Sequence, residues 1–530
     1  MARIFLSDSD YYFKFYGVGE NEVYLPTGKI TLEIEEGTRA KLFGTTGGKE
    51  IFIDASSSEV SIDNYYSYLV VKDNQGGEVF IPLSKVPVEV TFSDNTSYYA
   101  YLDSSGFNLI PESELDSSSL LKGIPEDVDA LLSKYRWNKK IITYSFNEEI
   151  PNEYYDSNLI EGWAPFPPEA RDAVREIFSQ IESFTDLKFV EVSEDGDIRF
   201  NLLKTSDNED GFAFYPVEGN PLGGDVFINN EHSASDFAKG KYAYSTLLHE
   251  IGHALGLKHP FDCCPVLSKE KDNSDYTVMT YTDIHYRTPH FYHSEGRVWV
   301  ESQPEACRDT YGFYDVAALQ LLYGANSNFN AEDTYYDVNN LYNEKKHLTI
   351  WDTGGIDTID ASRVEGSCFV DLRPGTLSSI DYHSPEMIAE EAISTGDLPA
   401  WAYDWAVDFL KKEKEFLYTG KNNLAISYNV LIENLLTGSG DDFVVDNQLD
   451  NSISTGDGND TVFLIGNGHD VVDGGGGYDK VVIALPEEQV ELEDLGNGEF
   501  VLGSLDGSFH SHLFNVEDVL FNENGFDFSV

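Results

Sequence analysis

The sequence has little cysteine, little positive charge and no long hydrophobic run. Its four cysteines, Cys263, Cys264, Cys307 and Cys368, are too few for a disulfide scaffold, although one bridge between the 263–264 pair and Cys307 stays open. Lys and Arg number 35 against 93 Asp and Glu, and the net charge of −58 argues against nucleic acid or an anionic membrane as a partner. No run approaches about 18 apolar residues, so no membrane-spanning helix is expected.

The N-terminal residues also lack the pattern of a cleaved signal peptide. The segment MARIFLSDSDYYFKFYG has no sustained apolar stretch and carries early acidic residues. If the protein leaves the cell, we expect a secretion route that does not depend on a cleaved N-terminal signal peptide.

The chain divides into three regions of different character. Hydrophobic content of 41% and aromatic content of 13% are sufficient for packed cores, and 530 residues predict more than one domain. Residues 1–120 alternate short apolar and polar runs between turn residues, which predicts an all-β module. Residues 121–326 mix strand-like runs with helices, one of them over 244–257, which indicates an α/β domain. Glycine, aspartate and asparagine dominate residues 327–530, apart from a helical insertion at 385–417.

The stretch HEIGHALGLKH has the pattern of a catalytic zinc site. His249 and His253 are four residues apart, so they lie on one face of a helix and can bind one ion. Gly256 permits the left-handed turn that ends the helix and returns the chain with His259 as third ligand. Three protein ligands leave the fourth position to water, and zinc lowers the pKa of that water to about 7. We expect Glu250 to take its proton during attack on a peptide carbonyl and to protonate the departing amine.

Together with the segment YTVMTY that follows, the motif resembles that of the metzincins. The resemblance implies that Met279 forms an apolar floor beneath the metal without ligating it. It also implies that Tyr281 can ligate zinc and swing away to stabilise the oxyanion. The alternative for Tyr281 is an ordinary buried tyrosine, since the chain contains 32 tyrosines.

The similarity to the serralysin branch of the metzincins covers about residues 125–530. LLSKYRWNKKIITYSF is similar to the strand that opens the serralysin catalytic domain, and DVAALQLLYGAN is similar to the helix that closes it. LGGDVFIN resembles the edge strand that pairs with an extended substrate, so the predicted substrate-binding residues are Gly223, Gly224, Asp225 and Val226. The first 120 residues lie outside the resemblance, and we expect them to be an accessory or binding domain.

Four tandem segments, TGSGDDFVV, TGDGNDTVF, IGNGHDVVD and GGGGYDKVV, fit a nine-residue glycine–aspartate repeat imperfectly. Glycines let the backbone curl so that its carbonyls face a cation, and the aspartate adds a charged oxygen. The pattern predicts a C-terminal parallel β-roll that binds a few structural calcium ions. The predicted calcium-binding residues are Gly438, Gly440, Asp442, Gly456, Gly458, Asp460, Gly466, Gly468, Asp470, Gly475, Gly477 and Asp479.

These features predict a secreted, zinc-dependent endopeptidase that cleaves internal peptide bonds of proteins. The expected cofactors are one catalytic Zn²⁺ and several structural Ca²⁺, and we expect a monomer. Serralysin-like rolls usually accompany export by type I secretion machinery without an N-terminal signal, and the C-terminal DFSV is similar to the serralysin export signal. The alternative is a calcium-dependent adhesive or surface protein that keeps a metzincin domain as a scaffold, but a scaffold has no need of Glu250.

Overall fold

The computed structural model describes residues 124–521, except 157–158, 206–208, 218, 263–264 and 466, together with twelve strand segments between residues 2 and 111. The predictions on the C-terminal DFSV, on Gly466 and on the 263–264 cysteine pair lie outside the described residues. Within the described part of the chain, no helix is long and apolar enough to cross a membrane.

The segments described between residues 2 and 111 are all strands, and most of their pairings are parallel. Ala2 pairs with Asn21 and Tyr12 pairs with Thr31, so partners lie 19 residues apart. Two six-stranded sheets result, in the orders β1-β3-β5-β9-β8-β7 and β12-β11-β10-β6-β4-β2. The strands are β1 (Ala2–Phe5), β2 (Tyr12–Phe15), β3 (Glu20–Tyr24), β4 (Thr31–Glu35), β5 (Arg39–Phe43), β6 (Glu50–Asp54), β7 (Val60–Tyr65), β8 (Tyr68–Asp73), β9 (Glu78–Pro82), β10 (Val88–Phe92), β11 (Ser97–Asp103) and β12 (Gly106–Pro111).

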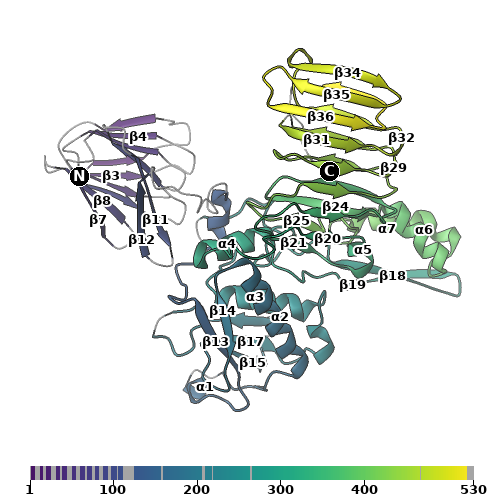
Figure 1. Cartoon of the computed structure of the whole chain (residues 1–530). Coiled ribbons are helices and arrows are strands. Elements are labelled where there is room, and N and C mark those ends of the chain that lie inside the picture. Colours follow the sequence, from purple (N-terminus) through teal and green to yellow (C-terminus); the bar gives the residue numbers. More distant parts are fainter. Residues whose placement is uncertain are drawn as a thin grey trace.

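The next region is built around a five-stranded sheet of order β14-β13-β15-β17-β16, in which only β16 is antiparallel to its neighbour. Figure 1 shows α2 and α3 side by side against this sheet. The strands are β13 (Ile141–Phe146), β14 (Lys188–Glu191), β15 (Ile198–Leu203), β16 (Gly211–Ala213) and β17 (Val226–Asn229). The helices are η4 (Glu126–Leu131), α1 (Asn152–Asp156), α2 (Pro168–Phe184), η5 (Ala234–Phe237), α3 (Tyr242–Ala254) and α4 (Phe313–Tyr323).

The periodicity of α2 explains its packing. Pro168 stands at the first helical position, where a missing N–H costs nothing and the fixed φ favours the helix. One face of the helix is fully apolar and buried against the sheet, while Glu and Arg occupy the other. The buried positions are Ala170, Ala173, Val174, Ile177, Phe178, Ile181 and Phe184.

The C-terminal region is a roll of short strands, stacked above the region of the five-stranded sheet in Figure 1. Phe443 pairs in parallel with Thr461, and Thr461 with Lys480, so successive coils are offset by 18 or 19 residues. Two eight-stranded sheets have the orders β20-β22-β26-β28-β31-β36-β35-β34 and β21-β25-β24-β23-β27-β30-β33-β37. Their inward valines, Val444, Val462, Val472 and Val481, are all buried, and each contributes about 1.5–3 kcal/mol by burial.

The elements of the roll are short and numerous. They are β20 (Tyr335–Asp337), α5 (Leu341–Glu344), β21 (Leu348–Ile350), β22 (Thr358–Asp360), β23 (Ser367–Asp371), β24 (Thr376–Tyr382), β25 (Leu424–Ile426), β26 (Asn434–Leu436), β27 (Phe443–Val445), β28 (Ser452–Ser454), β29 (Asp457–Gly458), β30 (Thr461–Leu464), β31 (Gly468–Asp473), β32 (Gly476–Gly477), β33 (Lys480–Ile483), η7 (Glu487–Gln489), β34 (Val490–Gly496), β35 (Glu499–Ser504), β36 (Phe509–Phe514) and β37 (Asp518–Phe521).

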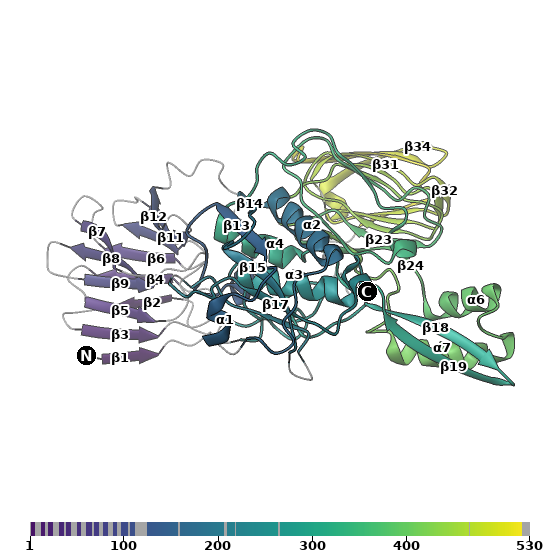
Figure 2. The ribbon, with the colours of Figure 1, turned by 90° about the horizontal axis from the view of Figure 1, so that it is seen from below.

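Two insertions from distant parts of the chain pack together. The hairpin β18 (Arg287–Ser294) and β19 (Arg297–Pro304) lies alongside α6 (Pro385–Thr395), η6 (Ala400–Ala402) and α7 (Tyr403–Glu413), as Figure 2 shows. They share a small separate core, whose members include Phe291, Ala389, Leu398, Ala406 and Leu410. The predicted 385–417 insertion is therefore a helical pair that covers one face of the hairpin.

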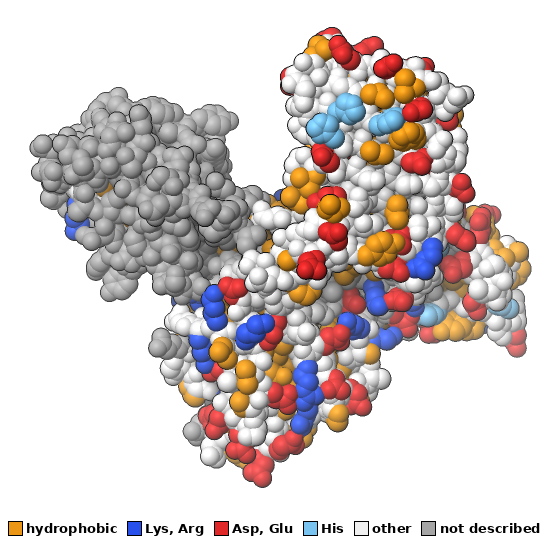
Figure 3. Space-filling model, in the orientation of Figure 1, with side chains coloured by type: hydrophobic (Ala, Val, Ile, Leu, Met, Phe, Trp, Pro, Cys, Tyr) orange, Lys and Arg blue, Asp and Glu red, His pale blue; other side chains and the backbone are white. Residues whose placement is uncertain are grey.

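The region of the five-stranded sheet and the roll share one apolar core. A continuous cluster of buried side chains runs from Ile124 through α3 and α4 to Val516 near the end of the described chain. On the face of the molecule that Figure 3 shows, carboxylate side chains lie over both regions, whereas Lys and Arg gather on the lower half. Lys480 is the only Lys or Arg after Lys421, so the outer roll is strongly negative.

Candidate metal centre and active site

Helix α3 and the turn after it assemble the histidine triad. His249 and His253 lie on α3, and Gly256 reverses the chain with a φ of +101°, as the sequence predicts. A Cβ on Gly256 would lie 2.2 Å from the carbonyl oxygen of Tyr135, so a larger residue cannot occupy this position without displacing the backbone. Buried Lys258 then anchors the returning segment through Nζ, which donates to the carbonyls of Ala130, Asp262 and Pro265.

The three imidazoles meet through their Nε2 atoms. Nε2 of His259 lies 3.3 Å from that of His249 and 3.0 Å from that of His253. The Nδ1 atoms point outward to the carbonyl of Val278, the carbonyl of Leu257 and the carboxylate of Asp262, at 2.7, 2.8 and 3.1 Å. Each Nδ1 is thus the donor, and this tautomer turns three Nε2 lone pairs toward one point.

This arrangement fits a zinc ion. Lone pairs cannot hydrogen-bond to one another, so they need a cation between them, and three imidazole nitrogens are a common zinc ligand set. Burial lowers the pKa of His249 to about 4 and that of His253 well below its usual range, which keeps both imidazoles neutral and able to bind metal. Among the described residues, the triad is the group of three or more His, Cys, Asp or Glu side chains whose ligand atoms lie close enough together to hold one metal ion.

Glu250 is buried beside the triad with one carboxylate oxygen unsatisfied. It is only 4% exposed, and Oε2 has no hydrogen-bond partner among the described residues. Burial, and then the charge of Glu209, raise the pKa of Glu250 to about 8. A carboxyl group with a raised pKa next to a metal position is suited to accept and return a proton.

Met279 lies beneath α3 and is fully buried. Its Sδ would lie 2.5 Å from a Cβ added to Gly252, so the glycine between His249 and His253 makes room for this methionine. Met279 therefore packs directly under the helix that carries the two ligands.

Asp315 on α4 braces the turn around Met279, and sequence reasoning missed it. Its carboxylate accepts from Thr277 Oγ1, Val278 N and Gly312 N at 2.5, 2.8 and 2.9 Å. The carbonyl of Val278 in turn orients His249. In the sequence, Asp315 is merely an acidic residue at a helix start.

Replacing Asp315 with Ala is expected to destabilise the protein by about 2–4 kcal/mol, because three donors lose a buried acceptor. Zinc affinity should fall as well, because Val278 holds His249. Urea unfolding and zinc titration measure the two effects, with Asp408→Ala on the exposed face of α7 as control. An unchanged zinc affinity in the Asp315 variant would contradict the bracing role.

Tyr281 stands at the mouth of the site. It is 70% exposed, and its ring centroid lies 4.6 Å from that of His259 and 5.7 Å from that of His249. The alternative of an ordinary buried tyrosine is therefore wrong. Partial burial and the charge of Glu250 raise the pKa of its hydroxyl, so the hydroxyl remains protonated and can donate a hydrogen bond.

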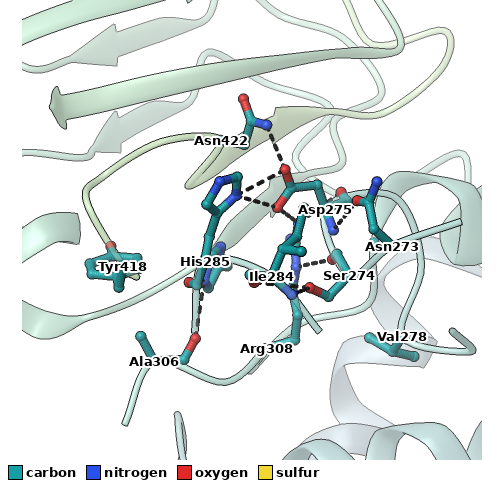
Figure 4. A network of polar contacts seen from close by, with 12 residues as sticks. Asn273, Ser274, Asp275, Val278, Ile284, His285, Ala306, Arg308, Tyr418 and Asn422 are labelled. Atoms are coloured by element: carbon teal, nitrogen blue, oxygen red, sulfur yellow. Dashed lines mark hydrogen bonds and ion pairs between the residues drawn. The ribbon is translucent and has the colours of Figure 1, made fainter. Parts of the chain in front are cut away.

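The segment before the methionine turn is tied to the roll by a buried polar network, shown in Figure 4. Asn422, in the segment between α7 and β25, donates to the Asp275 carboxylate at 2.5 Å, and His285 Nδ1 lies 3.1 Å from both of its oxygens. Arg308 donates to the carbonyls of Ser274 and Asp275, at 2.7 Å each. Burial disfavours the charge of Asp275, but His285 and then Arg308 outweigh it and hold its pKa below the usual value.

The predicted substrate-binding residues are wrong for the edge-strand role. β17, which contains Val226, lies between β15 and β16, so its neighbours occupy both of its sides. Asp225 is buried and forms a two-point ion pair with Arg199 at 2.8 and 2.7 Å, while Gly224 packs against Trp137 and Gly223 donates to the carbonyl of Asn220. These residues support the sheet, and the edge strand beside the histidines is β16.

The predicted calcium-binding aspartates form a ladder inside the roll. Oδ1 of Asp442 accepts from Cys368 N, Oδ1 of Asp460 from Asp442 N, and Oδ1 of Asp479 from Asp460 N, at 2.6, 2.8 and 2.9 Å. The three Oδ2 atoms are buried without a partner among the described residues. Asp470 lies on the other side of the roll, where it accepts from Asn451 N at 3.0 Å.

Burial raises the pKa of Asp442 to about 6 and that of Asp460 to about 7. Asp446, which lies outside the glycine–aspartate pattern, also has a buried Oδ2 without a partner among the described residues, and burial raises its pKa to about 8. Unpaired, buried carboxylate oxygens in register fit a hard cation such as calcium.

Glycines of neighbouring coils approach too closely for any side chain. A Cβ on Gly458 would lie 2.1 Å from the carbonyl oxygen of Gly440, and one on Gly477 would lie 1.5 Å from that of Gly458. Gly458 and Gly477 have φ values of +135° and +146°, which other residues rarely adopt. The repeated glycines are therefore required by the stacking itself.

Cys307 does not take part in the bridge that the sequence analysis left open. Cys307 is buried and carries a free thiol, as does Cys368. The Cys307 backbone is fixed by a hydrogen bond to the carbonyl of Gly240, beneath the start of α3. We therefore withdraw the pairing between Cys307 and the 263–264 pair.

Comparisons with known proteins agree with this geometry. Residues 136–285, which include the triad, Met279 and Tyr281, match the Matrixin family of M10 peptidases. The chain is 27% identical to the serralysin of Proteus mirabilis over 361 residues, which are 60% of this chain and 63% of that protein. It is 27% identical to the metallopeptidase AprA of Pseudomonas marginalis over 342 residues (60% and 62%), and 26% identical to the serralysin of Photorhabdus luminescens over 390 residues (67% and 68%).

The match to the first two relatives thus covers a little under two thirds of their length. Residues 136–285 of this chain thus match the peptidase domain of the Matrixin family, and about 60% of the chain is similar to serralysins.

Proposed function

We propose that this protein is a secreted, zinc-dependent endopeptidase that hydrolyses internal bonds of protein substrates and is stabilised by calcium. The observation that carries the proposal is the convergence of three Nε2 atoms beside the unpaired Oε2 of buried Glu250. His249, His253 and His259 would hold the ion. When bound, zinc supplies a positive charge that polarises a peptide carbonyl and lowers the pKa of a water molecule.

The side chains of this protein then have separate tasks. Glu250 accepts the proton of the attacking water and returns it to the amine that leaves. Its position is suited to this because its second oxygen has no competing partner. The Tyr281 hydroxyl donates to the oxyanion that develops on the carbonyl, since its ring lies at the exposed side of the His249 and His259 rings.

An extended substrate segment would add to β16 as a further strand. β16 pairs with β17 on one side, and no strand covers its other side in the described structure. A Cβ on Gly211 would lie 3.1 Å from Cγ of Glu250, so a peptide along β16 passes directly next to the general base. Main-chain pairing is independent of sequence, which suits an enzyme that accepts many protein substrates.

We further propose that calcium ions occupy the aspartate ladder of the roll. The residues that would hold them are those predicted from the repeats, with Asp446 in addition. The unpaired Oδ2 atoms of Asp442, Asp460 and Asp479 support this proposal, as does the negative charge of the outer roll. Low calcium inside the cell would leave the roll poorly folded, and higher calcium outside would fold it, which is compatible with type I export of a monomer.

The division into residues 1–120, 121–326 and 327–530 remains our working domain proposal, with the first region as an accessory or binding module. The shared core from Ile124 to Val516 supports treating the second and third regions as one folding unit. The adhesive alternative has no observation in its favour, because a scaffold would have no use for a buried carboxylate with an unpaired oxygen.

Mapping the products tests the proposed function. An unfolded protein such as reduced casein is incubated with the zinc- and calcium-loaded chain, and its fragments are sequenced by mass spectrometry. We expect internal cleavages with new amino and carboxyl ends and no stepwise loss from either terminus. Products trimmed only from the ends, or none at all, would contradict an endopeptidase.

A further inference from the structure

A cavity of about 410 Å³ opens directly beside the general base. It lies between the start of β16, the outer side of α3 and the segment that follows Met279. Its volume is in the range of pockets that bind a side chain or a small ligand. The lining residues that matter here are Glu209, Asp210, Tyr242, Thr246, Glu250 and Asp283.

The cavity wall is negatively charged. Glu209, Asp210 and Asp283 contribute carboxylates from two separate segments, and none of the described residues that line it is Lys or Arg. The basic partner of Asp210 is His232, whose Nε2 lies 3.4 Å away. Glu250, whose buried Oε2 has no partner among the described residues, also lines this cavity. Several carboxylates around one open cavity attract a cation.

Asp283 is offset only by the nearby charge of Arg287. It forms no ion pair with any described residue, and the nearby guanidinium of Arg287 instead donates to Tyr286 Oη and the Ser302 carbonyl. Burial raises the pKa of Asp283. Burial, followed by the charges of Asp283 and Asp210, also raises the pKa of Tyr242, so these three residues share one neighbourhood.

The position of the cavity identifies which substrate residue enters it. Glu209, Asp210 and Gly211 mark the N-terminal end of β16. A peptide that pairs antiparallel with β16 passes its C-terminal half along this end, because antiparallel partners run in opposite directions. The residue that immediately follows the scissile bond is then the one next to the cavity.

We propose that the site prefers lysine or arginine immediately after the scissile bond. This inference rests on the proposed endopeptidase function. The cationic end group replaces the missing partner of Asp283, while the ring of Tyr242 and the Thr246 side chain contact the aliphatic stem. A neutral residue leaves the carboxylates desolvated without compensation, and an acidic residue meets like charges.

The test is a set of peptides that differ only at the residue after the scissile bond, with Lys, Arg, Leu, Gln or Glu at that position. For the zinc- and calcium-loaded full chain, we expect kcat/KM for Lys and Arg to exceed that for Leu and Gln at least tenfold. The Glu peptide should be at least a hundredfold poorer than the Lys peptide. In the Asp283→Asn variant, the ratio of kcat/KM for Lys to that for Leu should fall about tenfold, whereas the exposed control Glu231→Gln should keep the wild-type ratio.

The outcomes are distinct. Hydrolysis of all peptides with equal kcat/KM, or a Lys to Leu ratio that Asp283→Asn leaves intact, would overturn the charge preference alone. A preference for Lys at the residue before the bond would overturn the assigned position. If no peptide were cut, the proposed function would fail and this inference with it. The wild-type series needs no variant, so it remains decisive if Asp283→Asn does not fold.

Discussion

Replacing Glu250 with Gln is expected to reduce kcat for peptide hydrolysis by roughly 10²–10⁴-fold, while the protein still binds zinc. Glutamine has nearly the same shape but cannot take a proton, and Glu250 is not one of the three ligands. KM should change little, because the substrate main chain is held by β16. The measurement is steady-state kinetics with zinc content determined on the same sample.

Glu169→Gln, an exposed glutamate in the first turn of α2, is the matched control and should retain wild-type kcat. If Glu250→Gln kept more than about a tenth of the activity with full zinc, another group would be the base. If it lost zinc instead, the role of Glu250 would be to support the triad rather than to transfer protons.

Removing calcium while zinc is retained is expected to lower the melting temperature of the roll by roughly 5–10 °C for each site that had been well occupied. The reason is that unpaired carboxylate oxygens of Asp442, Asp460 and Asp479 then remain buried without a counter-charge. Calorimetry in a calcium-selective chelator, against the calcium-loaded protein, measures the change. Equal melting temperatures would contradict calcium sites in the roll.

The stability of the calcium-free roll is expected to decrease as the pH rises. The folded pKa is about 6 for Asp442, about 7 for Asp460 and about 8 for Asp446, each raised from 3.8 first by burial. A raised folded pKa means that the calcium-free folded roll binds protons more tightly than the unfolded chain. These three aspartates therefore stabilise the calcium-free roll most below about pH 4. Their contribution to its stability is lost as the pH rises toward 8. Calcium replaces these protons, so the stabilisation by calcium should grow from pH 5 to pH 8.

The variant Asp460→Asn separates the destabilising effect of a buried charge from the stabilising effect of bound calcium. Without calcium at pH 8 the variant should melt higher than the wild type, because a buried charge is gone, and with calcium it should melt lower, because a ligand is gone. Asp457→Asn removes the same charge from an exposed position of the same coil and should show neither change. A shift in the same direction under both conditions would contradict the ligand role of Asp460.

Local spacing explains which features the sequence could predict. His249, His253 and Gly256 lie within one helix and its terminal turn, so their geometry follows from residues eight or fewer positions apart. The repeat aspartates are equally local, because each coil places its aspartate against the next coil at a fixed offset of 18 or 19 residues. The spacing of these residues in the sequence is therefore enough to predict how their side chains are arranged.

Features that depend on tertiary pairing could not be predicted in the same way. LGGDVFIN has the composition of a strand, but only the order of the sheet reveals that this strand, β17, is internal and that β16 forms the edge. Asp225 could not be distinguished from a substrate-binding residue until Arg199 was found against it. Asp315 and Asp283 act through segments distant from them in the chain, so their neighbours are not visible in the sequence.

Zinc titration of metal-free protein in excess calcium tests the central claim most directly. Hydrolysis of an unfolded protein should rise in proportion to added zinc and stop rising at one zinc per chain, because His249, His253 and His259 form a single site. Full hydrolysis without zinc, or activity that continues to rise well beyond one equivalent, would contradict a single catalytic zinc held by this triad.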